Sequence, residues 1–260
     1  MIPISLFIGL LVHSNLHPVV PSMNWISENQ AGYSIYYTAI DAAEIPGYRM
    51  NLNQGMNRVQ EFFQKPYKQH FDIYIHPDRA SLDSTWQSDW GMPAFKSECW
   101  MVASGVASRL DIIAPQRWDS FACEHRSADT TAMNNLITHE LMHVFHGQNN
   151  PSSDFSEVSG LDWFVEGLAT YASGQCDSIR ILAVQEAIKQ NEIPEHLADF
   201  WSGNLRYGLS GSVVMYLDAH YGREKLFQVL FCTELNSLLD KLGVDEETLL
   251  HDWKGYVKSL

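Results

Sequence analysis

Two histidines and a glutamate stand in the pattern His139-Glu140-Leu-Met-His143. On a helix, positions i and i+4 share one face, so the two imidazoles can reach one metal ion together. Glu140 would lie beside that ion without having to bind it, as a base that deprotonates a metal-activated water does. The pattern predicts a catalytic zinc site with His139 and His143 as ligands and Glu140 as general base.

A five-residue pattern also arises by chance in a chain with 11 histidines, so the residues around it matter. The residues that flank the pair recur at helical spacing, and Gly147 supplies a stop. The apolar positions are Ile137, Leu141, Val144 and Phe145. A helix with ligands on one face and an apolar stripe opposite them is what a metal site requires.

A catalytic zinc ion usually takes three protein ligands, and two residues compete for the third place. His146 is about 10 Å further along the helix axis than His139, too far for both to bind one ion at about 2 Å. We expect it to orient other groups or to pack at the helix end. Glu166 lies on a second predicted helix, over residues 161–174, and is the better candidate.

Glu166 also has a purely structural interpretation. Its large apolar neighbours could form an ordinary core face while the carboxylate points to water, as a lone glutamate in a helix usually does. Against this, Gly167 and Ala169 are small, as close packing of this helix on the site helix would require. The neighbours in question are Trp163, Phe164, Leu168 and Tyr171.

The motif HELMH, with 22 residues between His143 and Glu166 and the run WFVEGLATYAS around Glu166, resembles the gluzincin metallopeptidases, in particular their small peptidase MA-like members. The resemblance is specific at the site and loose over the rest, from about Tyr33 to the C-terminus. Metzincins fit poorly, because their motif needs glycine and histidine where this chain has His146 and Asn149. The resemblance implies a zincin-like fold with zinc held by His139, His143 and Glu166.

The resemblance also implies a role for Tyr207, at the start of the predicted helix 208–220, in stabilising the transition state. A tyrosine packed at a helix start with a wet hydroxyl is the alternative. One departure is Thr170, which stands where thermolysin-like members have an aspartate that orients a ligand histidine. That support must come from elsewhere, and Asp162, Glu157 and a backbone carbonyl all remain open.

The function predicted from these residues is hydrolysis of peptide bonds by a zinc-activated water, with peptides or proteins as substrates. Two other functions stay open: a non-catalytic binding or adhesion protein on a peptidase scaffold, and a non-haem iron enzyme with two histidines and one carboxylate. Retention of Glu140 counts against the first. The helical HExxH pattern counts against the second.

Composition fits one substantial folded domain, since 45% of the 260 residues are hydrophobic and 8 are tryptophan. The balance of 31 acidic against 17 basic residues gives a net charge of -14, without a cluster of basic residues along the chain. Nucleic acids and anionic membranes are therefore not expected as partners. Nothing in the composition indicates an oligomeric state.

The N-terminus carries an apolar run, residues 2–12, that has the length of a signal-peptide core and is too short to span a bilayer. The first basic residue is Arg49, so the positive charge that precedes such a core is missing. A leader over residues 1–22, which would favour a secreted or extracytoplasmic protein, competes with a buried strand or an imperfect gene start. The four cysteines permit two disulfides or four buried thiols: Cys99, Cys123, Cys176 and Cys232.

The fold class predicted is α+β, a zincin-like two-lobed metallopeptidase in which residues 23–260 form one catalytic domain. An upper lobe, about 23–148, holds a mixed sheet with helices and the site helix, and a helical lobe covers about 160–260. The polar loop 148–160 lies between them. Strands are predicted over 32–40, 71–76 and 104–115, and helices over 48–63, 179–189, 208–220, 223–235 and 245–260. The last strand is either an open edge that binds extended substrate, as in similar enzymes, or an ordinary strand of the sheet.

Overall fold

The computed structural model describes residues 23–260. The predicted leader, residues 1–22, lies outside the described residues. Within residues 23–260, no helix is long and apolar enough to cross a membrane.

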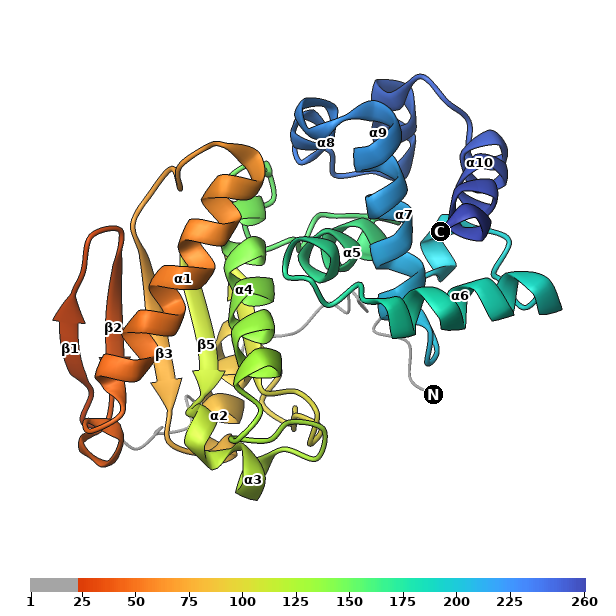
Figure 1. The fold of residues 1–260 in the computed structure, drawn as a ribbon. Coiled ribbons are helices and arrows are strands. Elements are labelled where there is room, and N and C mark those ends of the chain that lie inside the picture. The colour runs from red at the N-terminus through yellow and green to blue at the C-terminus, as the bar shows by residue number, and fades with distance from the viewer. Residues whose placement is uncertain (1–22) are drawn as a thin grey trace.

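The sheet has five strands in the order β1-β2-β3-β5-β4 (Figure 1). Its centre is parallel, whereas β1 and β4 pair with their neighbours in antiparallel fashion at the two edges. Strand β3 alternates between fully and partly buried side chains, which is the period that a sheet with one well-covered face imposes. The strands are β1 (Ile26–Asn29), β2 (Tyr33–Tyr37), β3 (Phe71–His76), β4 (Ala103–Val106) and β5 (Arg109–Ile113).

Ten α-helices and three short 3-10 helices occur in the described residues. The helices that accompany the sheet are α1 (Ile45–Phe63), α2 (Arg79–Asp89), α3 (Trp118–Phe121) and α4 (Thr130–Gly147), with 3-10 turns η1 (Ala39–Asp41) and η2 (Pro115–Arg117). The later ones are α5 (Asp162–Ala172), α6 (Ser178–Gln190), η3 (Leu197–Asp199), α7 (Arg206–Tyr221), α8 (Arg223–Val229), α9 (Leu235–Leu242) and α10 (Glu246–Ser259). The protein is thus α+β with a mixed sheet.

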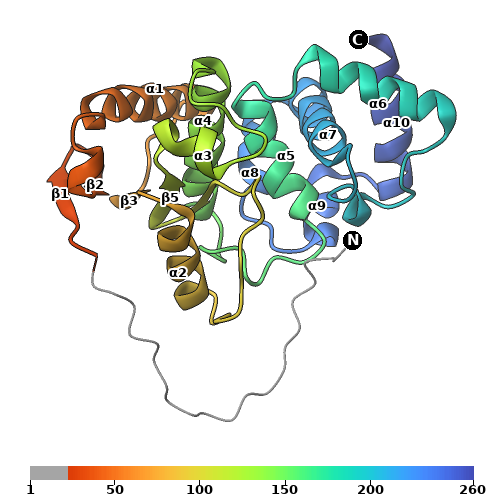
Figure 2. The same cartoon turned by 90° about the horizontal axis from the view of Figure 1, so that it is seen from below.

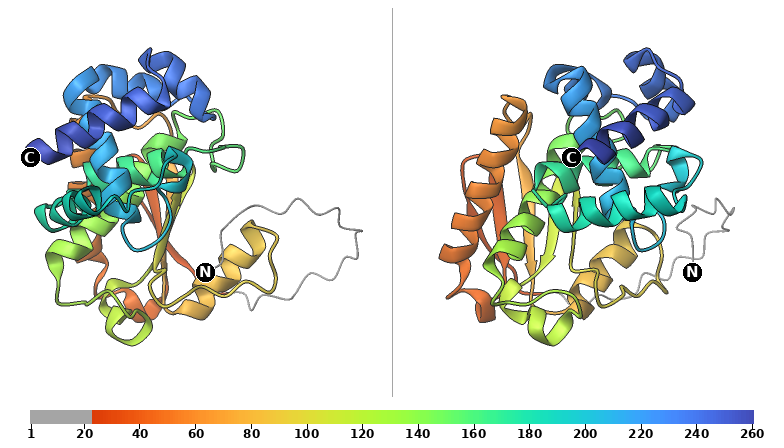
Figure 3. Two further views of the ribbon diagram at one scale, coloured as in Figure 1. Left: turned by 90° about the vertical axis from the view of Figure 1, so that its right-hand side faces the viewer. Right: turned by 45° about the vertical axis from the view of Figure 1, so that its right-hand side comes forward.

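Helices α1 and α4 lie on one face of the sheet and α2 on the other (Figure 2). Helices α5 to α10 gather to one side of the sheet in Figure 1 and in the right-hand view of Figure 3, and the loop 148–161 joins them to α4. Helix α4 packs on α1 on one side and on α5 on the other. The site helix therefore stands at the junction of the sheet part and the helical part.

Most predicted elements are present with slightly different ends, but the predicted edge strand 104–115 is wrong in one respect. This range forms a hairpin of two strands, with β5 inside the sheet and β4 at the edge. The apolar residues of β5 are buried because the strand is flanked by β3 and β4. The open edge therefore belongs to residues 103–106 and not to Leu110–Ile113.

The predicted helix 223–235 is also wrong, since α8 ends at Val229 and α9 begins only at Leu235. The carbonyls of Leu230 and Cys232 accept hydrogen bonds from the Asn150 amide, at 2.7 and 3.0 Å. A residue more than 80 positions away in the sequence thus supplies hydrogen bonds to carbonyls in the segment between the two helices. The apolar spacing alone could not reveal this break.

Candidate metal centre

Helix α4 presents the HExxH residues from its most buried stretch, because every residue from Leu136 to Gly147 is buried. The Asp129 carboxylate caps the helix by accepting a hydrogen bond from the Ala132 amide, 2.9 Å away. Strand β4 lies directly against the helix: a methyl group on Gly105 would lie 2.3 Å from the Glu140 carbonyl oxygen. Only glycine allows this approach of the edge strand to the site.

Helix α5 brings Glu166 to the histidine pair. Its Oε2 lies 3.3 Å from His139 Nε2 and 3.6 Å from His143 Nε2, while the two Nε2 atoms are 3.0 Å apart. The histidines are buried, and the Glu166 side chain keeps 26% of its surface exposed. Glu166 therefore points into the cluster rather than away into solvent, and the cluster stays open on one side.

These distances fit a zinc ion. Bonds of about 2.0–2.1 Å at tetrahedral angles separate neighbouring ligand atoms by about 3.3 Å, and the three observed separations bracket that value. Two imidazoles and one carboxylate are also a donor set that zinc accepts in catalytic sites. His139, His143 and Glu166 could thus hold a metal ion together.

Gly167 does not play the part predicted for it. A methyl group there would lie 2.4 Å from the carbonyl oxygen of Ser210, so the residue allows close packing of α5 on α7 (Arg206–Tyr221) and not on α4. The prediction that Gly167 is small to let α5 approach the site helix is therefore wrong, since its close neighbour is Ser210 of α7. Close α5–α7 packing fixes the position of the helix from which Glu166 projects.

The group that orients His139 is Gln175, which the sequence did not single out. His139 Nδ1 lies 2.8 Å from Gln175 Oε1, and since a side-chain amide oxygen only accepts, the ring must donate from Nδ1. Nε2 is then left free to bind the metal. Asp162 and Glu157 make no such bond within the described residues. The sequence signal that could have pointed to Gln175 was the preceding Gly174, which turns the chain after α5 with a positive φ of 79°.

Burial decides the charge of the proposed base. Burial raises the pKa of Glu140 to about 7; the charge of His139 lowers this pKa, and the negative charge of Glu166 raises it further. Burial also acts to raise the pKa of Glu166, but the two histidines outweigh it and hold that pKa well below its usual range. One carboxyl is thus poised to exchange a proton near neutral pH, and the other stays ionised as a metal ligand must.

Tyr207 lies in the first turn of α7, and its ring centre is 6.4 Å from that of His139. Burial and the nearby Glu166 raise its pKa to about 12, so the hydroxyl keeps its proton at neutral pH. It can then donate a hydrogen bond into the site. The structure brings this residue close to the metal cluster without assigning it a role.

His146 lies outside the cluster, as the helical rise requires. Its Nε2 donates to the Leu230 carbonyl, 3.2 Å away, and its ring packs on Phe155 and Phe164. Burial and the neighbouring His143 lower its pKa to about 3. His146 is therefore a neutral residue that ties the end of α4 to the end of α8 (Arg223–Val229).

The cysteines follow neither of the two predicted patterns. Cys99 and Cys123 form a disulfide, whereas Cys176 and Cys232 are buried thiols. The disulfide joins the segment before β4 to the segment after α3, on the side of the sheet part that faces α7 through Trp100. A single cross-link thus braces one stretch near the site.

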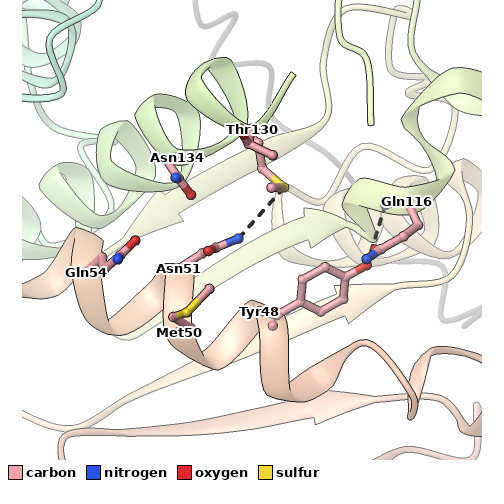
Figure 4. Close-up of a pocket in the computed structure, with 9 residues that line it drawn as sticks. Tyr48, Met50, Asn51, Gln54, Gln116, Thr130 and Asn134 are labelled. Atoms are coloured by element: carbon pink, nitrogen blue, oxygen red, sulfur yellow. Dashed lines mark hydrogen bonds between the residues drawn. The ribbon is translucent and has the colours of Figure 1, made fainter. Parts of the chain in front are cut away.

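A hollow of about 430 Å³ lies elsewhere, between α1 and the start of α4 (Figure 4). Its lining contains no carboxylate, imidazole or thiol, and side-chain amides dominate it. The lining residues are Gly47, Tyr48, Met50, Asn51, Gln54, Gln116, Thr130, Met133 and Asn134. Such a lining cannot supply acid–base or metal chemistry, so the candidate site remains the cluster on α4 and α5.

Comparison with known proteins adds little to this description. No family model matches the chain, and no curated protein matches it. Among solved structures, that of native yeast LTA4 hydrolase is similar over 91% of this chain, at 10% sequence identity and a TM-score of 0.48. The chain spans 38% of the length of that structure. At this level of similarity the site has to be interpreted from its own residues.

Proposed function

We propose that the protein is a zinc-dependent peptidase that hydrolyses peptide bonds, with His139, His143 and Glu166 as metal ligands. The observation that carries the proposal is the convergence of these ligand atoms from two helices, with Glu140 beside them on α4. A binding protein would need neither the vacant fourth position that three ligands leave nor a base next to it.

A bound zinc ion would supply Lewis-acid chemistry, lowering the pKa of water and polarising the substrate carbonyl. Glu140 would take the proton of the attacking water and later hand it to the leaving amine. Burial raises the pKa of Glu140, which favours uptake of that proton. Tyr207 would donate a hydrogen bond to the oxyanion as it forms.

The substrate would lie along β4, the edge strand packed on the site helix. In the described part of the sheet, only β5 pairs with β4, so the outer edge of residues 103–106 offers backbone groups to an extended peptide. Beyond the strand, the Ala107 amide donates to the Ser153 carbonyl at 3.0 Å, which closes that end of the edge. Peptide or protein substrates fit such a surface better than small molecules do.

The test compares the wild-type protein with Glu140→Gln, which keeps the shape of the side chain and removes the base. The variant should bind one equivalent of zinc like the wild type and lose about 10²–10⁴-fold in peptide cleavage. Metal content is measured on purified protein, and cleavage by sequencing the new ends in a digested denatured proteome. A zinc-loaded Gln variant with wild-type activity, or a wild-type protein that binds no zinc, would refute the proposal.

A further inference from the structure

One arginine near the candidate metal centre has an environment unlike that of its neighbours. The guanidinium carbon of Arg206 lies 4.9 Å from the ring centre of Trp100, 5.4 Å from that of Trp201 and 5.2 Å from that of Tyr207. Trp100 belongs to the sheet part, and the other rings belong to the helical part. The cation thus sits among three aromatic rings, where the two parts meet.

The charge of Arg206 has no acidic partner. Among residues 23–260, no carboxylate lies within 4 Å of its guanidinium, and its buried Nε makes no hydrogen bond. Arg180, the other arginine near Tyr207, differs: it pairs with Asp177 and donates to the Gln175 carbonyl at 2.7 Å. In a chain with a net charge of -14, a half-buried cation without an anion is unusual.

Trp100 is held firmly in place against Arg206. It directly follows Cys99, which is cross-linked to Cys123, and its carbonyl lies 3.2 Å from His125 Nε2. The Arg79 guanidinium donates to the carbonyls on both sides, those of Cys99 and Met101, at 2.9 and 2.8 Å. These bonds fix one wall around the arginine, so the aromatic surround is preorganised.

The cation also lies at the right place along the substrate path. The Tyr207 ring centre lies 5.2 Å from the Arg206 guanidinium carbon and 6.4 Å from the ring centre of His139. Trp100, the other neighbour of Arg206, precedes the first residue of β4 by three positions. Because successive residues of an extended peptide are about 3.5 Å apart, a group at Arg206 would belong to a residue within about three positions of the scissile bond. A peptide that ran antiparallel to β4 would present its carboxyl-terminal side there.

We propose that Arg206 binds a carboxylate of the substrate and so makes the protein selective for peptides with an acidic group near the cleaved bond. The inference rests on the proposed function, since it assigns the substrate of that site. A guanidinium is weakly hydrated and can offer paired donors to a planar anion. The carboxylate is either the C-terminus of the peptide or an Asp or Glu side chain.

The experiment measures peptide binding by fluorescence anisotropy with zinc-loaded Glu140→Gln protein, which should not cleave the probes. Two pairs of labelled peptides separate the sources of the carboxylate. One pair has blocked ends and differs by Glu against Gln, and the other has neutral side chains and differs by a free against an amidated C-terminus. At least one acidic member should bind about tenfold more tightly than its neutral partner, the usual gain from a hydrogen bond to a charged group.

Arg206→Gln in the same background should bring that ratio to about one, and Arg206→Lys should restore part of it. Lys258→Gln, an equal change of charge at an exposed position near the end of α10, should leave the ratio unchanged. Equal binding within both pairs, or a preference that survives Arg206→Gln in a folded variant, would overturn the inference. A carboxylate preference in a protein that cleaves nothing would overturn only the proposed function, and the absence of any peptide binding would overturn both.

Discussion

Two buried polar clusters in this protein contain histidine, and they differ in whether each ring nitrogen has a hydrogen-bond partner of matching kind. On the sheet, His76 has a partner at each ring nitrogen: Ser81 Oγ and Asp111 Oδ1, both 2.7 Å away. Arg109 lies 2.8 Å from Asp111 and completes what we call the His76 network. At the metal centre, His139 and His143 instead direct Nε2 atoms at one another and at Glu166.

The difference separates a cluster whose hydrogen bonds are complete from one that could hold a metal ion. The His76 network needs nothing more, because both ring nitrogens have partners and His76, Ser81 and Asp111 are shielded from water. At the candidate metal centre, ligand atoms of His139, His143 and Glu166 lie around one point, an arrangement that a bound cation would stabilise. Removal of a residue should therefore affect stability in the first cluster and metal binding in the second.

The largest effect is expected for His143→Ala. Zinc binding of about 10–16 kcal/mol shared by three or four ligands implies about 4 kcal/mol for each, so the affinity should fall on the order of a thousandfold. The unfolding free energy of the metal-free variant should change far less. Competition with a zinc chelator measures the first quantity and urea denaturation the second; an unchanged affinity would remove His143 from the site.

The reverse result is expected for His76→Leu. The substitution leaves Ser81 and Asp111 short of a partner in a buried place, which should cost about 3 kcal/mol of unfolding free energy. Zinc affinity should stay at the wild-type value. His196→Leu is the matched control, because that ring is largely exposed and its contact with Glu246 should contribute less than about 1 kcal/mol. A loss of zinc binding in His76→Leu would contradict the separation of the two clusters.

A smaller effect is expected for Gln175→Leu, which removes the acceptor that orients His139. Loss of such a partner typically costs about 10–100-fold in metal affinity. Gln175→Glu should preserve or raise the affinity, since a carboxylate accepts the same hydrogen bond. Chelator competition on both variants gives the result, and equal affinities in the Leu variant and the wild type would show that the bond to Nδ1 has no influence on the metal.

The smallest effect concerns pH and His146, whose folded pKa of about 3 lies below its ordinary value of 6.5. Protons then bind the unfolded chain more readily, so the unfolding free energy contributed by this residue is complete above pH 6.5 and is lost as the pH falls. The slope is at most about 1.4 kcal/mol per pH unit. His146→Gln, which keeps a donor for Leu230, should reduce the slope of metal-free protein between pH 6.5 and 5. Equal slopes would mean that His146 titrates normally.

The sequence by itself determined the local parts of this protein. The shared face of His139 and His143 on α4 follows from i, i+4 spacing, and β3, α1 and α5 follow from apolar periods that hold within a dozen residues. Glu166 could be chosen over His146 because helical rise is a fixed length. These features depend on neighbours along the chain, so a printed sequence contains them.

Only the tertiary structure decided which distant groups meet. The break between α8 and α9 depends on Asn150, the orientation of His139 on Gln175, and the surround of Arg206 on Trp100. In each case a polar or charged group is satisfied by a residue from another element, and no periodic pattern records that pairing. The order of β4 and β5 was likewise decided by the tertiary structure. The residues of either strand are compatible with an edge position, and only the assembly of the sheet places β4 there.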